Sequence, residues 1–111
     1  MAATVDSLRS FWSHLASGLE GGRPLLAVLE EAGSECDSPE VSEAVADVAE
    51  MVARGTMLSE ALEAQPRFFG PGAVHVIRGG EYLGLMGPAA RLIADAAEQC
   101  SSCAGWQGEQ T

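Results

Sequence analysis

The chain has 111 residues, the size of a single domain, and 47% of them are hydrophobic, as is ordinary for a globular protein. Sixteen acidic residues face only six basic ones, all of them arginine, so the formal net charge is −10. A chain with this charge repels phosphate backbones, which argues against a nucleic-acid-binding protein. The longest stretches without a charged residue are ten residues long, well short of the ~18–20 that a membrane-spanning helix needs.

Alanine and leucine together outnumber valine, isoleucine and threonine by more than two to one, which favours helix over strand. Prolines and glycines mark where helices begin and end, because proline is tolerated in the first turn and glycine at the C-terminal cap. With the spacing of apolar residues, they predict helices over 8–19, from 24 to about 33, from 39 to about 52, from 58 to 66, from 71 to about 78, and from 88 to about 100.

We therefore predict an all-α fold, a compact bundle of six short helices over residues 6–104, with flexible ends at 1–5 and 105–111. Four large aromatic residues are expected in its core: Phe11, Trp12, Phe68 and Phe69. The N-terminus lacks the cationic and apolar segments of a secretory signal, so we expect a cytoplasmic protein without direct membrane insertion.

Three cysteines are present, Cys36, Cys100 and Cys103, and we expect all of them to be reduced because a domain of this size does not need disulfides. Cys100 and Cys103 have the CxxC spacing of redox and zinc sites. A redox role is disfavoured because the pair follows the predicted last helix, where the helix dipole destabilises a thiolate. A zinc site would need two further ligands, for which only Cys36 and a histidine are candidates.

No catalytic set is recognisable in the sequence. The chain has two histidines, His14 and His75, no lysine and no glycine-rich phosphate loop. Both histidines lie within apolar helical patterns and are interpreted as structural or solvent-edge residues. We do not expect enzymatic activity.

Four sequence blocks occur in an order that is similar to a known family: FWSHLASGLEGGRPLLAVL at 11–29, GTMLSEAL at 55–62, PRFFGP at 66–71 and IRGGEYLG at 77–84. Over about residues 7–100 the chain resembles the cytoplasmic domain of the type II secretion system F family, a six-helix bundle. That family supplies the inner-membrane platform proteins of type II secretion and type IV pilus machines. Its members usually carry two such domains, each followed by transmembrane helices, whereas this sequence has one domain and no such helices.

The resemblance implies a non-catalytic protein-interaction and assembly module that associates with itself, as a homodimer. The partners that it implies are components of secretion or pilus assembly, including the platform protein and the cytoplasmic ATPase. The alternative is a helical module that binds or responds to calcium or zinc and has been repurposed away from secretion.

Gly80, Glu81 and Gly84 match the family's Gly-Glu-x-x-Gly turn between the last two helices. Two glycines around a carboxylate allow a sharp reversal of the backbone and leave Glu81 at the lip of the turn. The resemblance implies calcium as the possible cofactor, with Glu81 at the position of the motif's glutamate. We favour the alternative, in which Glu81 caps or hydrogen-bonds the turn itself.

An acidic stripe is predicted on the third helix, where four carboxylates recur at intervals of three, four and three residues: Glu40, Glu43, Asp47 and Glu50. They belong to a segment without any cation between Arg23 and Arg54. The favoured interpretation is a solvated face that maintains solubility. The alternative is a docking surface for a basic partner, whose encounter rate such a field would raise.

Overall fold

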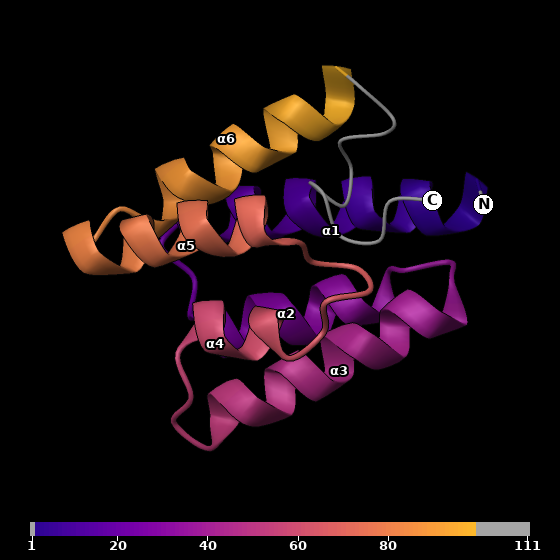
Figure 1. Ribbon diagram of the computed structural model, residues 1–111, viewed down its shortest axis with the longest axis horizontal. Coiled ribbons are helices and arrows are strands. Elements are labelled where there is room, and N and C mark those ends of the chain that lie inside the picture. Colours follow the sequence, from indigo (N-terminus) through magenta and orange to yellow (C-terminus); the bar gives the residue numbers. More distant parts are fainter. Residues whose placement is uncertain (1, 100–111) are drawn as a thin grey trace.

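The computed structural model describes residues 2–99, with the side chains of residues 5–97. This part of the chain forms six helices and no strand, which confirms the predicted all-α fold. The helices are α1 (Ala2–Glu20), α2 (Leu25–Ser34), α3 (Pro39–Ala53), α4 (Leu58–Glu63), α5 (Pro71–Leu83) and α6 (Met86–Gln99) (Figure 1).

The six helices form a closed ring. Each helix packs against the next one in the sequence, and α6 closes the ring by packing along α1. In Figure 1, α1, α5 and α6 occupy the upper half of the bundle and α2, α3 and α4 the lower half. The radius of gyration is 12.1 Å, which agrees with the ~13 Å of a compact domain of about 100 residues. The predicted compact bundle is thus confirmed.

Prolines start the helices much as the sequence predicts. Pro39 and Pro71 are the first residues of α3 and α5, and the side chain of Ser38 accepts a hydrogen bond from the Val41 N–H at 3.4 Å. Helix α6 begins at Met86, two residues before the predicted start at Pro88. A proline in the first turn of a helix costs no hydrogen bond, because the amides there have no intrahelical partner.

Flexible ends were predicted at 1–5 and 105–111, and the structure describes most of the first segment but not the second. Helix α1 starts at Ala2, so residues 2–5 of the segment that we expected to be flexible belong to this helix. The other predicted flexible end, 105–111, lies outside the described residues. Cys100 and Cys103 lie outside them as well.

Aromatic side chains fill the centre of the ring, as predicted. The ring centroid of Phe11 lies 4.9 Å from that of Trp12 and 5.3 Å from that of Phe69. All three side chains are buried, and so is Phe68, whose ring lies beneath the Arg67 guanidinium at 5.0 Å. These contacts join α1 to the segment between α4 and α5, so the aromatic cluster holds both halves of the bundle together.

The turn between α5 and α6 is shorter than predicted, because α5 continues to Leu83 and does not end near Arg78. Gly80 is a buried helical residue that packs against α6: a Cβ there would lie 2.7 Å from the Cβ of Ala89. The chain reverses at Gly84, where φ is +72° and the Leu85 N–H bonds the Gly80 carbonyl at 2.7 Å. The motif is therefore a capped helix end, in which Gly80 permits close packing and only Gly84 makes the turn.

Candidate functional site

Glu81 is held by the start of α4. Its carboxylate accepts hydrogen bonds from the backbone N–H of Ser59 at 2.8 Å and from the Ser59 hydroxyl at 2.7 Å. Helix α4 has no side-chain cap of its own, since Met57 stands at its N-cap position. Glu81 therefore caps α4 from a neighbouring helix, at the end where a negative charge is favoured by the helix dipole.

This arrangement differs from the capping role that we predicted for Glu81, because the helix that it caps is α4 and not the turn to α6. Both of its carboxylate oxygens are engaged by Ser59. Within the described part of the chain, no three His, Cys, Asp or Glu side chains come together in a way that suits a metal ion. Calcium binding at Glu81 stays a prediction.

The acidic stripe lies on the solvent side of α3, since Glu40, Glu43, Asp47 and Glu50 are all exposed. Two of the four have cationic partners: Glu50 is 2.9 Å from Arg54, and Glu40 is 3.4 Å from Arg67. For Glu43 and Asp47 no ion pair occurs within residues 5–97. Two of its four carboxylates therefore carry negative charge that no cation among residues 5–97 compensates.

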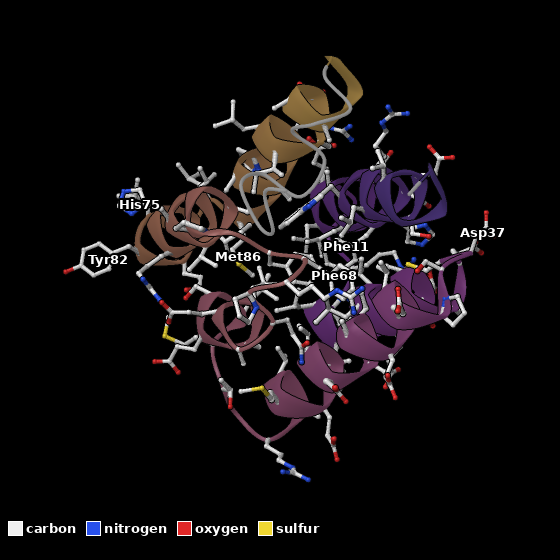
Figure 2. The ribbon with its side chains drawn as sticks, turned by 45° about the vertical axis from the view of Figure 1, so that its right-hand side comes forward. Phe11, Asp37, Phe68, His75, Tyr82 and Met86 are labelled. Carbon is white, nitrogen blue, oxygen red and sulfur yellow. The ribbon has the colours of Figure 1, made fainter. Side chains whose placement is uncertain are left out.

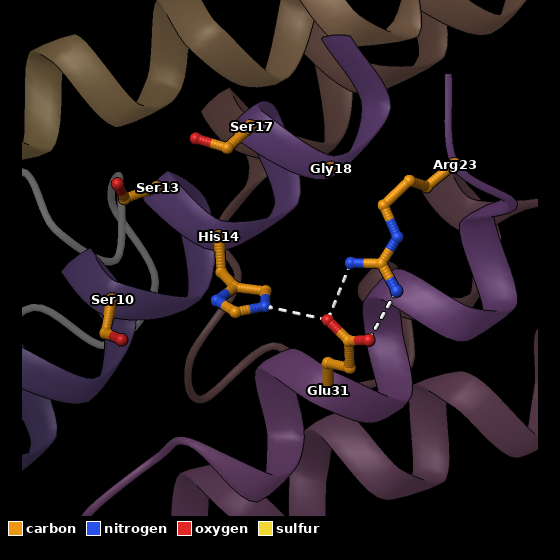
Figure 3. A pocket seen from close by; sticks show the side chains of 7 residues that line it. All are labelled: Ser10, Ser13, His14, Ser17, Gly18, Arg23 and Glu31. Carbon is orange, nitrogen blue, oxygen red and sulfur yellow. Dashed lines mark hydrogen bonds and ion pairs between the residues drawn. The ribbon is translucent and has the colours of Figure 1, made fainter. Parts of the chain in front are cut away.

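A polar pocket of about 420 Å³ lies between α1 and α2, and sequence reasoning did not find it. Figure 3 shows His14 and Arg23 converging on Glu31 from opposite sides. Nε2 of His14 lies 3.3 Å from Glu31 Oε1, and the Arg23 guanidinium forms a bidentate ion pair with the same carboxylate. Three serine hydroxyls from α1 line the rest of the pocket: Ser10, Ser13 and Ser17.

The electrostatics of this pocket are those of a structural ion pair. Hydrogen bonds from Arg23 and then from His14 lower the pKa of Glu31 from 4.5 to about 2. The same ion pair raises the pKa of Arg23. Within the described residues no serine hydroxyl is hydrogen-bonded to His14, so the pocket shows no paired nucleophile and base. Its residues connect α1, α2 and the loop between them.

The remaining candidates do not gather into one site. His75 is exposed on α5 and points away from the bundle in Figure 2. Cys36 is partly buried, and its thiol donates to the carbonyl of Ala32 at 3.2 Å. Burial raises the pKa of this thiol, and the charge of Asp37 raises it further. A raised pKa lowers the thiolate fraction, so Cys36 is suited to packing and not to nucleophilic chemistry.

An exposed apolar patch covers the hairpin of α5 and α6. It comprises Tyr82, Leu83, Leu85 and Leu92, which we call the hairpin patch. Tyr82 is 92% exposed and Leu83 72%, and Figure 2 shows Tyr82 directed away from the bundle. These are four of the five large hydrophobic side chains exposed in the described part of the chain. Exposed apolar side chains of this size are candidates for an interaction surface.

One feature of the sequence, an uncharged run, coincides with most of this patch. No charged residue lies between Glu81 and Arg91, a run that combines a helix end, a turn and a helix start. Such a run is typical of a buried segment, yet the chain reverses at Gly84 and leaves its large side chains outside. Exposure of the patch depends on which helices cover the hairpin, and that is a property of the fold.

Comparison with known proteins places the chain in a family. None of the helices in residues 2–99 has the length and the hydropathy to cross a membrane. A search of curated proteins found no match. A family model described as type II secretion system (T2SS), protein F, matches residues 11–100, which is most of the chain. This match covers all the blocks that carried the resemblance, and the chain therefore belongs to the family of type II secretion system protein F.

Proposed function

We propose that this chain is a non-catalytic protein-interaction module that associates with itself, as a homodimer, within a type II secretion or type IV pilus assembly. Membership of the protein F family supports a role connected with secretion, because that family forms the platform of such machines and is not a family of enzymes. The partners that we propose are the platform protein and the cytoplasmic ATPase, and the place of action is the cytoplasm.

The hairpin patch is the observation that carries self-association. Leu92 lies on α6, and Leu85 directly precedes the first residue of this helix. Leu83 and Tyr82 extend this apolar surface onto the last turn of α5. A surface of this kind is covered in a stable assembly, since water contact with large aliphatic side chains costs roughly 25 cal/mol per Å².

Charge favours pairing at this face over the others. With a net charge of −10, two copies repel one another wherever their acidic surfaces meet. The hairpin from Tyr82 to Ala90 contains no charged residue, so contact there brings the fewest like charges together. A two-fold pairing would place the same patch on both sides, which is the commonest arrangement among homo-oligomers.

Sedimentation equilibrium of the full chain tests this proposal. We expect a monomer–dimer equilibrium that Leu83→Ser with Leu92→Ser shifts toward the monomer, because the variant removes two apolar contacts from each copy. Ala53→Ser, at an exposed position on α3, is the matched control and leaves the equilibrium unchanged. A wild-type chain that stays monomeric at millimolar concentration would refute self-association.

A further inference from the structure

A groove runs along the outer surface between α2 and α3. Its volume is about 460 Å³. Its floor is formed by Leu29 and Gly33 of α2 and Ala49 of α3, all of which are buried. Ala46 and Ala53 form the α3 wall, and their methyl groups are exposed. The surface inside the groove is therefore apolar, and its side chains are small.

Close packing of the two helices creates the groove. At Gly33, a Cβ would lie 3.2 Å from Cγ1 of Val45, so no larger residue fits without movement. The Ser42 hydroxyl donates to the Gly33 carbonyl at 2.9 Å and fixes the crossing of the helices. Because most residues that line the groove are glycine, serine or alanine, another helix could approach the outer side closely.

Carboxylates line both edges of the groove. Glu30 stands on the α2 edge and Glu50 on the α3 edge. Glu43 precedes Glu50 by seven residues, so the two lie on the same side of α3 about 10 Å apart. Glu50 pairs with Arg54, whereas Glu30 and Glu43 have no ion-pair partner among residues 5–97. The apolar floor therefore has a negative rim on each side.

We propose that the α2–α3 groove binds a cationic amphipathic helix from a partner protein. This inference rests on the proposed function as an interaction module and names the chemistry of one partner. The apolar side of the bound helix packs on the groove floor, and its Lys or Arg residues face Glu30 on one side and Glu43 with Glu50 on the other. From Ser42 to Ala53 the wall spans about 17 Å, which accommodates a helix of about 11–12 residues.

Charge complementarity selects this occupant over other ones. A second copy of the chain would bring more carboxylates to the rim, and its six arginines are its only cations besides the N-terminus, since it has no lysine. An anionic lipid surface is repelled for the same reason. A cationic helix instead relieves the repulsion among the rim carboxylates and covers the apolar floor at the same time.

Fluorescence anisotropy of the full chain with a labelled peptide tests the proposal. The probe is a 14-residue helical peptide with leucine and alanine on one side and lysine on both flanks. We expect the peptide to bind, and we expect its affinity to fall as the salt concentration rises. A scrambled peptide of the same composition, which has no apolar side, is expected to bind at least about tenfold more weakly. Equal binding of both peptides would overturn the proposal.

Two variants with the same charge change locate the binding site. Glu30→Gln with Glu43→Gln removes rim charges and should weaken binding about tenfold, whereas Glu60→Gln with Asp95→Asn removes two exposed carboxylates elsewhere and should change it by less than about twofold. Equal weakening by both pairs would overturn the proposal, because it would indicate non-specific attraction.

Ala46→Leu fills the groove without altering the charge and leaves the fold intact, because Ala46 is exposed on α3 and leucine favours helix. We expect this variant to lower the affinity for the peptide by about tenfold. Unchanged affinity in this variant would show that the groove is not occupied. These outcomes are separate from the proposed self-association, since Leu83→Ser with Leu92→Ser should leave peptide binding unchanged while shifting the dimer equilibrium.

Discussion

Two adjacent glycines in α5 give a sharp test of how this helix packs. Gly79 and Gly80 are both helical, and the same substitution to alanine has opposite expected effects at the two positions. A Cβ at Gly79 meets no atom within 4 Å apart from the backbone of its own helix, because the residue is exposed. A Cβ at Gly80 would lie 2.7 Å from the Cβ of Ala89 and 3.0 Å from the carbonyl oxygen of Leu85.

The magnitudes follow from these distances. Replacing a glycine in a helix interior by alanine stabilises the helix by roughly 0.5–1 kcal/mol, and Gly79→Ala should show this gain in full. At Gly80 the same gain is opposed by a contact that is about 1 Å shorter than the ~3.5–4.0 Å at which carbon atoms attract. Overpacking typically costs about 1–3 kcal/mol, so Gly80→Ala should lower the free energy of unfolding by about 1–2 kcal/mol overall.

Urea unfolding followed by circular dichroism measures both variants against the wild type. We expect Gly79→Ala to unfold at higher urea and Gly80→Ala at lower urea, with unchanged slopes. In thermal unfolding a change of 1 kcal/mol corresponds to a shift in Tm of roughly 4–8 °C for a domain of this size. If Gly80→Ala were as stable as Gly79→Ala, then α5 and α6 would not be in close contact at this position, and the account of the hairpin would be wrong.

The other predictions concern the capping carboxylate, the ion pair, the core and calcium. Glu81→Ala should lower the free energy of unfolding by about 2–4 kcal/mol, since it leaves a buried N–H and a hydroxyl unsatisfied, whereas Glu60→Ala on the exposed side of α4 should change it by less than about 0.5 kcal/mol in urea unfolding. Because the pKa of Glu31 is lowered from 4.5 to about 2, its carboxylate stabilises the fold above pH 4.5, and this contribution disappears as the pH falls toward 2. The stability difference between the wild type and Glu31→Gln should therefore shrink over that interval in acid titrations, and a constant difference would contradict the ion pair. Phe69→Ala should cost about 3–5 kcal/mol in the same unfolding assay, because it empties part of the aromatic cluster. If Glu81 is a calcium ligand, calorimetric titration with Ca²⁺ should give heat that Glu81→Gln abolishes. An absence of heat with the wild type would contradict calcium binding at this residue.

The number of helices and most of their starts could be predicted from local rules. Ser38 followed by Pro39 gives a capped start that does not depend on the rest of the fold, and the structure has α3 beginning there. The aromatic core followed from residue type, since side chains as large as Trp12 and Phe69 are seldom left in water. Family membership followed from the order of the blocks, which the match to residues 11–100 confirms.

What failed to follow from the sequence depends on contacts between distant residues. The predicted helix ends near residue 78, just before Gly79 and Gly80, but α5 continues to Leu83, and Gly80 packs against Ala89 of α6. Glu81 and Ser59 are 22 residues apart, and no spacing rule connects them. The exposure of Leu83 is likewise set by which helices surround the hairpin, and residue type alone does not reveal it.

We propose that this chain acts by binding components of a secretion or pilus assembly and not by catalysis. Crosslinking capture of the full chain in its own cells compares the wild type with Ala46→Leu, the variant that fills the α2–α3 groove. We predict that a secretion or pilus assembly component is captured with the wild type and is depleted with the variant, whose fold is checked by circular dichroism. Capture that contains no such component, or that is identical for both chains, would contradict the account.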